Sequence, residues 1–199
     1  MAAGTFTCPR CLRSAPITAG MKFCPHCGLP DAHLASQGGP IDVKVNDRPF
    51  RVHDRLAVGS ISTIYRCGFW DQGRQIEGVF KIARDARTNP LVDNEAKILR
   101  HLHAADDTRR FGPFLPQVVE NFDFAGGGAG SDVRRANVLQ MDPDIHSPDE
   151  LYTLGEVRAA YPAGLDGRDV AWIWRRLLNI LGFVHEQHIV HGAVLPMHV

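Results

Sequence analysis

Four of the five cysteines of this chain fall within its first 27 residues, and their spacing constrains the fold more than any other feature. They form two Cys-x-x-Cys pairs, Cys8 with Cys11 and Cys24 with Cys27. A two-residue gap lets both thiolates of a pair face one ion, and four thiolates suit tetrahedral Zn²⁺. So short a segment buries little apolar surface, so the metal would supply its folding free energy. The sequence predicts a structural zinc ribbon over residues 1–30.

Other interpretations of these cysteines stay open. Two disulfides or a redox pair are alternatives, which an intracellular chain without a thioredoxin-like βαβ context disfavours. His26 could compete with a thiolate as a ligand, although a fourth cysteine is already present. Arg10, Arg13 and Lys22 make the segment basic, but aromatic residues for base stacking are few. We therefore do not expect nucleic acid as a partner.

Composition narrows the classes of protein further. The 44% hydrophobic and 22% charged residues are those of a soluble globular protein. The 22 basic and 22 acidic residues balance, so no net field directs the chain to nucleic acid or an acidic membrane. No apolar run approaches the ~20 residues of a membrane span, and the amino terminus lacks the pattern of a signal peptide. We expect a cytoplasmic protein with no membrane partner.

Strand and helix patterns begin after residues 31–40, whose small residues, glycines and proline predict a linker. Apolar and polar residues alternate over 41–52 around Asn46-Asp47, which predicts a hairpin. One helix is expected over 89–104, with Asn89 as its N-cap. Three more strands are expected within 55–83, and others at 115–124 and 134–141. These elements predict an antiparallel sheet of about five strands interrupted by one helix.

That order of elements resembles the small lobe of a protein kinase. The segment 56–65 is similar to the glycine-rich phosphate loop, with only its middle glycine, Gly59, retained. The sequence Gly-Val-Phe-Lys resembles the strand that carries the ATP-anchoring lysine, here Lys81, and Glu95 matches the helix glutamate that pairs with it. The resemblance implies ATP as a candidate ligand of these three residues. It also implies that Cys67 is a small buried residue rather than a reactive thiol.

Each of these matches has a plainer alternative. A lone glycine in a hairpin can simply form the turn, a lysine on a strand can extend to solvent, and a helix glutamate is usually solvated. The resemblance to a kinase explains the three matches together, because a cation inside the sheet must reach the phosphates and a carboxylate must hold it there. Ala57 and Ser62 replace the two flanking glycines, which limits how closely backbone can approach phosphate.

The last part of the chain resembles the start of the large lobe. Residues 141–156 match the hinge and a short helix, and a long amphipathic helix is expected from about residue 167. Its apolar residues recur at helical spacing: Val170, Ile173, Trp174, Leu177, Leu178, Leu181 and Val184. The ending "HEQHIVHG" is very similar to the kinase sequence that leads into the catalytic loop.

The catalytic loop itself is degenerate by the same resemblance. After His191 and Gly192, the position of the catalytic aspartate holds Ala193, and the position of the metal-binding asparagine holds His198. An alanine methyl cannot accept a proton, and histidine is a poor ligand for Mg²⁺, which prefers oxygen. The segments that follow this loop in kinases are missing, so we expect the chain to be the amino-terminal part of a longer protein.

The predicted fold class is α+β: a small four-cysteine zinc ribbon, a kinase-like small lobe and the start of a helical large lobe. Its predicted parts are the ribbon (1–30), linker (31–40), small lobe (41–142), and hinge with partial large lobe ending in the catalytic loop (143–199). The function predicted is a zinc-ribbon, pseudokinase-like regulatory or binding module with weak nucleotide binding, an unidentified protein partner and no catalytic residue. The alternatives are an unusual Ser/Thr protein kinase and a zinc-ribbon adaptor for nucleic acid or protein.

Overall fold

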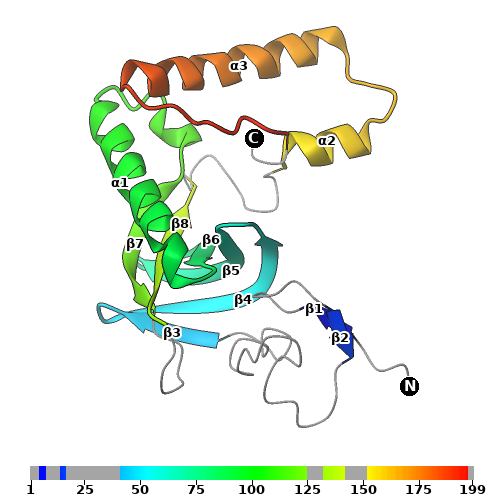
Figure 1. The fold of residues 1–199 in the computed structure, drawn as a ribbon. Helices are drawn as coiled ribbons and strands as arrows, with labels where there is room; N and C mark the ends of the chain where they lie inside the picture. Colours follow the sequence, from blue (N-terminus) through cyan, green and yellow to red (C-terminus); the bar gives the residue numbers. More distant parts are fainter. Residues whose placement is uncertain (1–4, 8–13, 17–40, 125–131, 142–151, 197–199) are drawn as a thin grey trace. The chain divides into compact units, whose positions relative to one another are not determined.

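The computed structural model describes residues 5–7, 14–16, 41–124, 132–141 and 152–196 (Figure 1). The chain divides into two compact units. The first contains Met1–Lys97 and Val118–Gln140, and the second contains Ile98–Gln117 and Met141–Val199. Helix α1 (Asn89–Ala105) begins in the first unit and ends in the second. No helix within the described ranges is long and apolar enough to cross a membrane.

A six-stranded sheet forms most of the first unit, in the strand order β3-β4-β5-β6-β8-β7 (Figure 1). The pairings of β3 with β4, β4 with β5, β5 with β6 and β6 with β8 are antiparallel. The predicted antiparallel sheet is therefore confirmed, with six strands instead of about five. Near the amino terminus, β1 (Thr5–Thr7) pairs antiparallel with β2 (Ser14–Pro16). The strands of the large sheet are β3 (Ile41–Val45), β4 (Arg48–Val58), β5 (Ser62–Asp71), β6 (Arg74–Ala83), β7 (Gln117–Phe124) and β8 (Arg134–Gln140).

Two tight turns fix the register of the first four strands. Asn46 and Asp47 join β3 to β4 with φ angles of 48° and 65°, and Gln72 and Gly73 join β5 to β6 with φ angles of 46° and 78°. Two-residue turns with positive φ at both positions match the twist of antiparallel strands, and Asn, Asp and Gly adopt that conformation most readily. The Asn46-Asp47 turn lies where the sequence predicts it.

Strand β4 is longer than the sequence pattern suggests. It continues from the hairpin at 41–52 into the strand that precedes Gly59, so two expected strands are one. Its pairing with β5 shifts register between Val52 and Arg55 and again between Arg55 and Ala57. Such irregularities bend a strand without ending it. The same strand can therefore pair with β3 at its start and lead into the Gly59 turn at its end.

The core of the first unit lies on one face of the sheet. Phe50 is fully buried and packs against Phe69 with ring centroids 5.4 Å apart. Phe80 contacts Phe122 and Phe124 of β7 edge-on, at 5.8 and 5.9 Å. The other buried members of this core are Val45, Val52, Cys67, Ile76, Ile82, Ala136 and Val138.

The start of α1 differs from the prediction. Asp85 caps a short 3-10 turn (Ala86–Thr88) that leads directly into α1, and its carboxylate accepts the backbone N–H of Arg87. Asn89 is therefore not the N-cap. Its amide accepts the backbone N–H of Arg135 at 2.7 Å and donates to the carbonyl of Val133 at 2.9 Å. The asparagine fastens the first turn of the helix to the backbone at the start of β8.

The second unit contains the end of α1, α2 (Leu154–Ala160) and α3 (Gly167–Glu186). Thr153 and Glu156 form a reciprocal capping box at the start of α2, and Asp166 caps α3. The core of this unit is built on the stacked rings of Phe111 and Phe183, whose centroids lie 4.5 Å apart. Leu102, Leu115 and Val184 are buried beside them.

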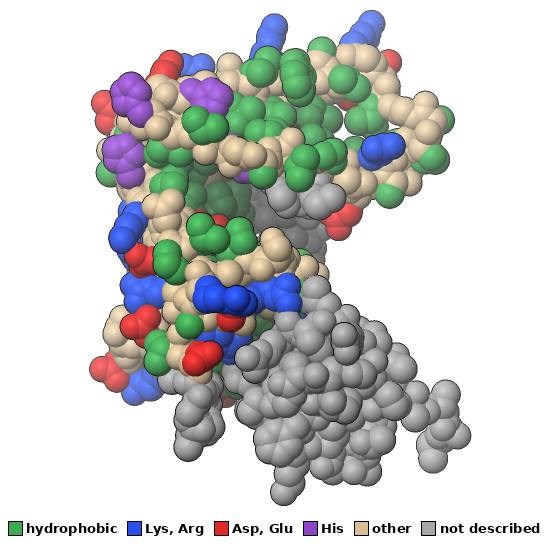
Figure 2. Space-filling view, in the orientation of Figure 1, with side chains coloured by type: hydrophobic (Ala, Val, Ile, Leu, Met, Phe, Trp, Pro, Cys, Tyr) green, Lys and Arg blue, Asp and Glu red, His purple; other side chains and the backbone are tan. Residues whose placement is uncertain are grey.

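The apolar stripe predicted on α3 is buried only near its carboxyl end. Val184 is 8% exposed, whereas Val170, Trp174 and Leu178 are 49%, 58% and 50% exposed. Figure 2 shows hydrophobic side chains gathered over this helix. Arg176 covers part of Trp172, with its guanidinium 4.9 Å from the indole centroid.

Candidate functional site

Lys81 and Glu95 form an ion pair inside the first unit. Lys81 lies on β6 between the buried residues Phe80 and Ile82, so its side chain points to the opposite face from theirs. Its Nζ lies 2.5 Å from Oε1 of Glu95 on α1. The two side chains are only 21% and 29% exposed. The structure thus brings together the lysine and glutamate that the sequence places 14 positions apart.

Asn137 holds the other side of this glutamate. It lies on β8, opposite Lys81 in the strand register, and is fully buried. Its Nδ2 donates to Oε2 of Glu95 at 3.0 Å and to the carbonyl of Val92 at 2.9 Å. Its Oδ1 accepts a hydrogen bond from Asn121 Nδ2 at 2.7 Å. Asn137 was not among the site residues predicted from the sequence, although a single polar residue within the apolar run of β8 was a signal that could have identified it.

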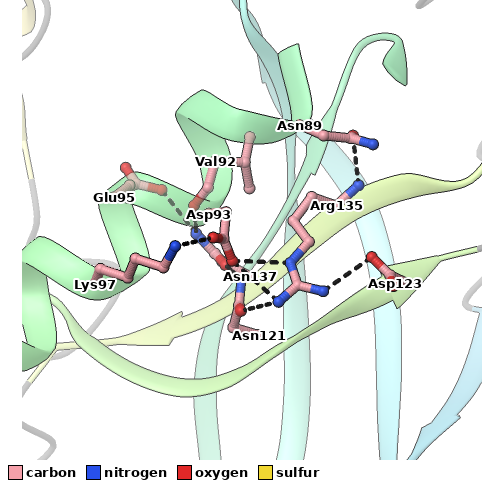
Figure 3. Close-up of polar contacts among 9 residues, drawn as sticks. All are labelled: Asn89, Val92, Asp93, Glu95, Lys97, Asn121, Asp123, Arg135 and Asn137. Carbon is pink, nitrogen blue, oxygen red and sulfur yellow. Dashed lines mark hydrogen bonds and ion pairs between the residues drawn. The ribbon is translucent and has the colours of Figure 1, made fainter. Parts of the chain in front are cut away.

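A second cluster of charged residues joins α1 to β7 and β8 (Figure 3). The Arg135 guanidinium contacts Asp93 on α1 at 3.0 Å and Asp123 on β7 at 2.9 Å. It also donates to Oδ1 of Asn121 at 2.6 Å. Lys97 contacts Asp93 at 2.7 Å. Hydrogen bonds from Lys97 and Arg135 lower the pKa of Asp93, although partial burial opposes that shift.

Gly59 lies in the turn between β4 and β5, at the expected place of a phosphate-binding loop. Its N–H donates to the carbonyl of Ser62 at 2.8 Å, which closes the turn, and its own carbonyl accepts Arg84 Nη1 at 3.3 Å. Its φ angle is not in the left-handed region, and an added Cβ would lie 3.5 Å from the nearest atom. The backbone therefore does not require glycine at this position.

The residues of the expected catalytic loop lie in the second unit, after α3. The Ala193 N–H donates to Nδ1 of His191 at 3.3 Å, and Gly192 has a φ of 73° between them. The N–H of Gly155, in α2, donates to the carbonyl of Pro196 at 2.7 Å, so this segment is fastened to the start of α2. His198 lies outside the described residues.

The predicted zinc ligands Cys8, Cys11, Cys24 and Cys27 also lie outside the described residues. Cys67 lies within them, fully buried on β5, and burial raises the pKa of its thiol to about 12. A thiol with so high a pKa carries almost no thiolate at neutral pH. Cys67 therefore behaves as a small core residue.

Comparison with known proteins gives evidence of fold only. No protein-family model matches the sequence, and no curated protein matches it. Among solved structures, 84 chains match the fold. One is the BubR1 kinase domain, with a TM-score of 0.59 and 14% sequence identity over 79% of this chain. The chain spans 42% of the length of that structure. The expected kinase-like fold is therefore confirmed.

Proposed function

We propose that this chain is a kinase-fold regulatory or binding module that binds a nucleotide weakly and does not transfer phosphate. The ion pair between Lys81 and Glu95 is the observation that carries the proposal. A lysine held by a carboxylate presents a fixed positive charge, which is what the α- and β-phosphates of a nucleotide need. Here both side chains are mostly buried, so water screens that charge less than it would on an exposed surface.

The residues of the first unit suit a phosphate ligand that binds weakly. Lys81 supplies the cation and Glu95 orients it. The turn at Gly59 would supply backbone N–H groups other than that of Gly59 itself, which bonds to Ser62. Gly59 is the only glycine of the resembled loop that this chain keeps. Side chains at Ala57 and Ser62 restrict the approach of phosphate to the backbone. We therefore expect an affinity weaker than micromolar.

Phosphate transfer would need groups that the sequence lacks at the resembled positions. The methyl group of Ala193 cannot orient a substrate hydroxyl or accept its proton, and His198 is a poor ligand for Mg²⁺. Loss of a positioned general base usually costs ~10²–10⁴-fold in rate. Because base and metal act on different parts of one transition state, Ala193→Asp alone is expected to remain inactive.

The amino-terminal segment adds a zinc site to the proposal. Cys8, Cys11, Cys24 and Cys27 would bind one Zn²⁺ through four thiolates, and the spacing of the two pairs supports this. The ion would have a structural role, because four protein ligands leave no open position for a substrate.

Calorimetric titration with ATP, with and without Mg²⁺, tests the binding step. Lys81→Met should weaken ATP binding at least tenfold. Lys97→Met is the matched control, since Lys97 is also paired with a carboxylate but is 72% exposed. Micromolar or tighter binding that survives Lys81→Met would show that the pocket lies elsewhere. Equal losses of ATP affinity in Lys81→Met and Lys97→Met would indicate that ATP is attracted by overall positive charge and not by Lys81 in particular.

A radiolabelled-ATP assay on the purified chain tests the chemical step. We expect no phosphate incorporation by the chain or by Ala193→Asp. Phosphate transfer that disappears in Lys81→Met would overturn the proposal and favour the unusual kinase.

A further inference from the structure

The Glu95 carboxylate is held from two strands at once. Its Oε1 contacts Lys81 on β6 at 2.5 Å, and its Oε2 accepts Nδ2 of Asn137 on β8 at 3.0 Å. One contact alone would leave the carboxylate free to rotate about its last side-chain bond. Two donors, one on each oxygen, define both its position and its plane.

The orientation of the Asn137 amide follows from its neighbours. The Val92 carbonyl accepts hydrogen bonds but cannot donate them, and an ionised Glu95 carboxylate has the same property. Both lie within 3.0 Å of the same atom, so that atom must be the amide nitrogen. The oxygen is then left to accept from Asn121. Because Val92 and Glu95 are three positions apart on α1, the two N–H groups hold one turn of the helix.

Asn137 is itself fixed by a continuous set of contacts. Asn121 donates to it, and the oxygen of Asn121 accepts Arg135 Nη2 at 2.6 Å. Arg135 also contacts Asp93, two positions before Glu95 on the same helix (Figure 3). This turn of α1 is therefore fastened to the sheet both through Asn137 and through Arg135. A fully buried and fully bonded amide has little freedom to change rotamer.

We propose that Asn137 is a positioning residue that holds Glu95, and through it Lys81, in the phosphate-binding arrangement before any ligand arrives. The phosphate-binding role rests on the proposed nucleotide binding, whereas the positioning of the ion pair does not. A site already ordered without ligand loses less conformational freedom on binding. The position of α1 that aligns Lys81 is then already present in the fold without a ligand.

A double-mutant cycle distinguishes the positioning role of Asn137 from a purely structural role. Asn137→Ala removes both donors of the amide. If Asn137 acts through Glu95, this change should weaken ATP binding about tenfold in the natural chain and have no further effect in Glu95→Ala. If it only stabilises the fold, the loss of affinity should be the same in both backgrounds. Phe50→Leu, a core change of the same unit, controls for lost stability.

A second measurement needs no nucleotide. Brief treatment with an amine-acylating reagent, followed by peptide mass spectrometry, reports the reactivity of each lysine. We expect Lys81 to react slowly because Glu95 holds its ammonium group, and to react several-fold faster in Asn137→Ala. In Glu95→Ala, adding Asn137→Ala should change nothing further. Lys44, exposed on β3, is the reference within the same molecule.

The two measurements distinguish the possible failures. If the natural chain binds no ATP but Lys81 becomes reactive in Asn137→Ala, the positioning role stands and the nucleotide proposal fails. If a folded Asn137→Ala leaves the reactivity of Lys81 unchanged, the positioning role is wrong whatever the nucleotide does. If Asn137→Ala does not fold, Asn121→Ala replaces it, since it removes the support of the amide without touching Glu95.

Discussion

Asp106 offers a sharp test of how the second unit is built. It follows directly after α1 and is only 7% exposed. Its carboxylate accepts the backbone N–H groups of Arg110, Phe111 and Gly112 at 3.0, 2.7 and 2.5 Å. The chain therefore folds back around one carboxylate, which places Phe111 on the ring of Phe183. Replacing Asp106 should loosen this loop and the core that depends on it.

The size of the effect follows from those three contacts. A hydrogen bond to a charged group contributes roughly 1.5–3 kcal/mol. The three bonds share one carboxylate, so adding three independent contributions would overestimate the total. Arg110 is exposed, and water can satisfy its N–H once the carboxylate is gone. We therefore expect Asp106→Ala to cost about 3 kcal/mol. Asp106→Asn should cost about 2 kcal/mol, since one acceptor oxygen remains but the charge is lost. Either is a large part of the ~5–15 kcal/mol of a typical domain.

The effect of Asp106 should also depend on pH. Burial alone would raise the pKa of Asp106, but the N–H groups of Gly112, Phe111 and Arg110 together lower it below its ordinary value. A carboxyl group with a lowered folded-state pKa stabilises the fold above its unfolded pKa of about 4. That stabilisation is lost as the pH falls further, through the folded-state pKa. The difference between the natural chain and Asp106→Asn should therefore be constant above about pH 5 and shrink below about pH 4.

Urea unfolding followed by circular dichroism measures the stability, and hydrogen exchange of residues 106–115 locates the change. The amides of Arg110, Phe111 and Gly112 should lose protection together in Asp106→Asn. Asp107→Asn, the exposed neighbour, should leave both readouts unchanged. Equal stability of Asp106→Asn and the natural chain at pH 7, or a difference that persists unchanged to pH 3, would refute the reasoning.

Three further predictions follow from the glycines and the cysteines. Gly78→Ala should lower stability by about 2 kcal/mol, because a Cβ there would overlap the Leu139 carbonyl on the paired strand. Gly68→Ala, whose Cβ would have 3.7 Å of room, is the control, and equal thermal shifts in the two would contradict the explanation. Gly59→Ala should leave the melting temperature within a few degrees and weaken only ATP binding, so a large thermal shift would show that this glycine is structural. Metal analysis of protein purified without added zinc should give one Zn²⁺ per chain, and Cys8→Ser should reduce it to near zero. A stoichiometry near zero in the natural chain would remove the zinc proposal.

Much of the sheet could be predicted from local patterns, and one part of the site from resemblance to a known family. The turn at Asn46-Asp47 follows from two residues that tolerate positive φ, and alternation then predicts the flanking strands. The pairing of Lys81 with Glu95 was predicted from resemblance to the kinase small lobe, and the two side chains do meet. Whether the pair binds nucleotide stays a prediction.

Other features depended on contacts between residues far apart in the chain. The apolar run of β8 could mark Asn137 as buried, but nothing local shows that its amide meets Glu95, 42 positions away, or that Asn89 bonds to β8 instead of capping α1. Both asparagines have side chains that can satisfy several kinds of neighbour, and only the packed structure decides which neighbour is present. Residue type and spacing determined where strands and turns could form, and the resemblance to the kinase small lobe indicated the charged pair. Tertiary packing decided the partner of each buried polar group, because a polar group removed from water must bond to whatever the fold brings beside it.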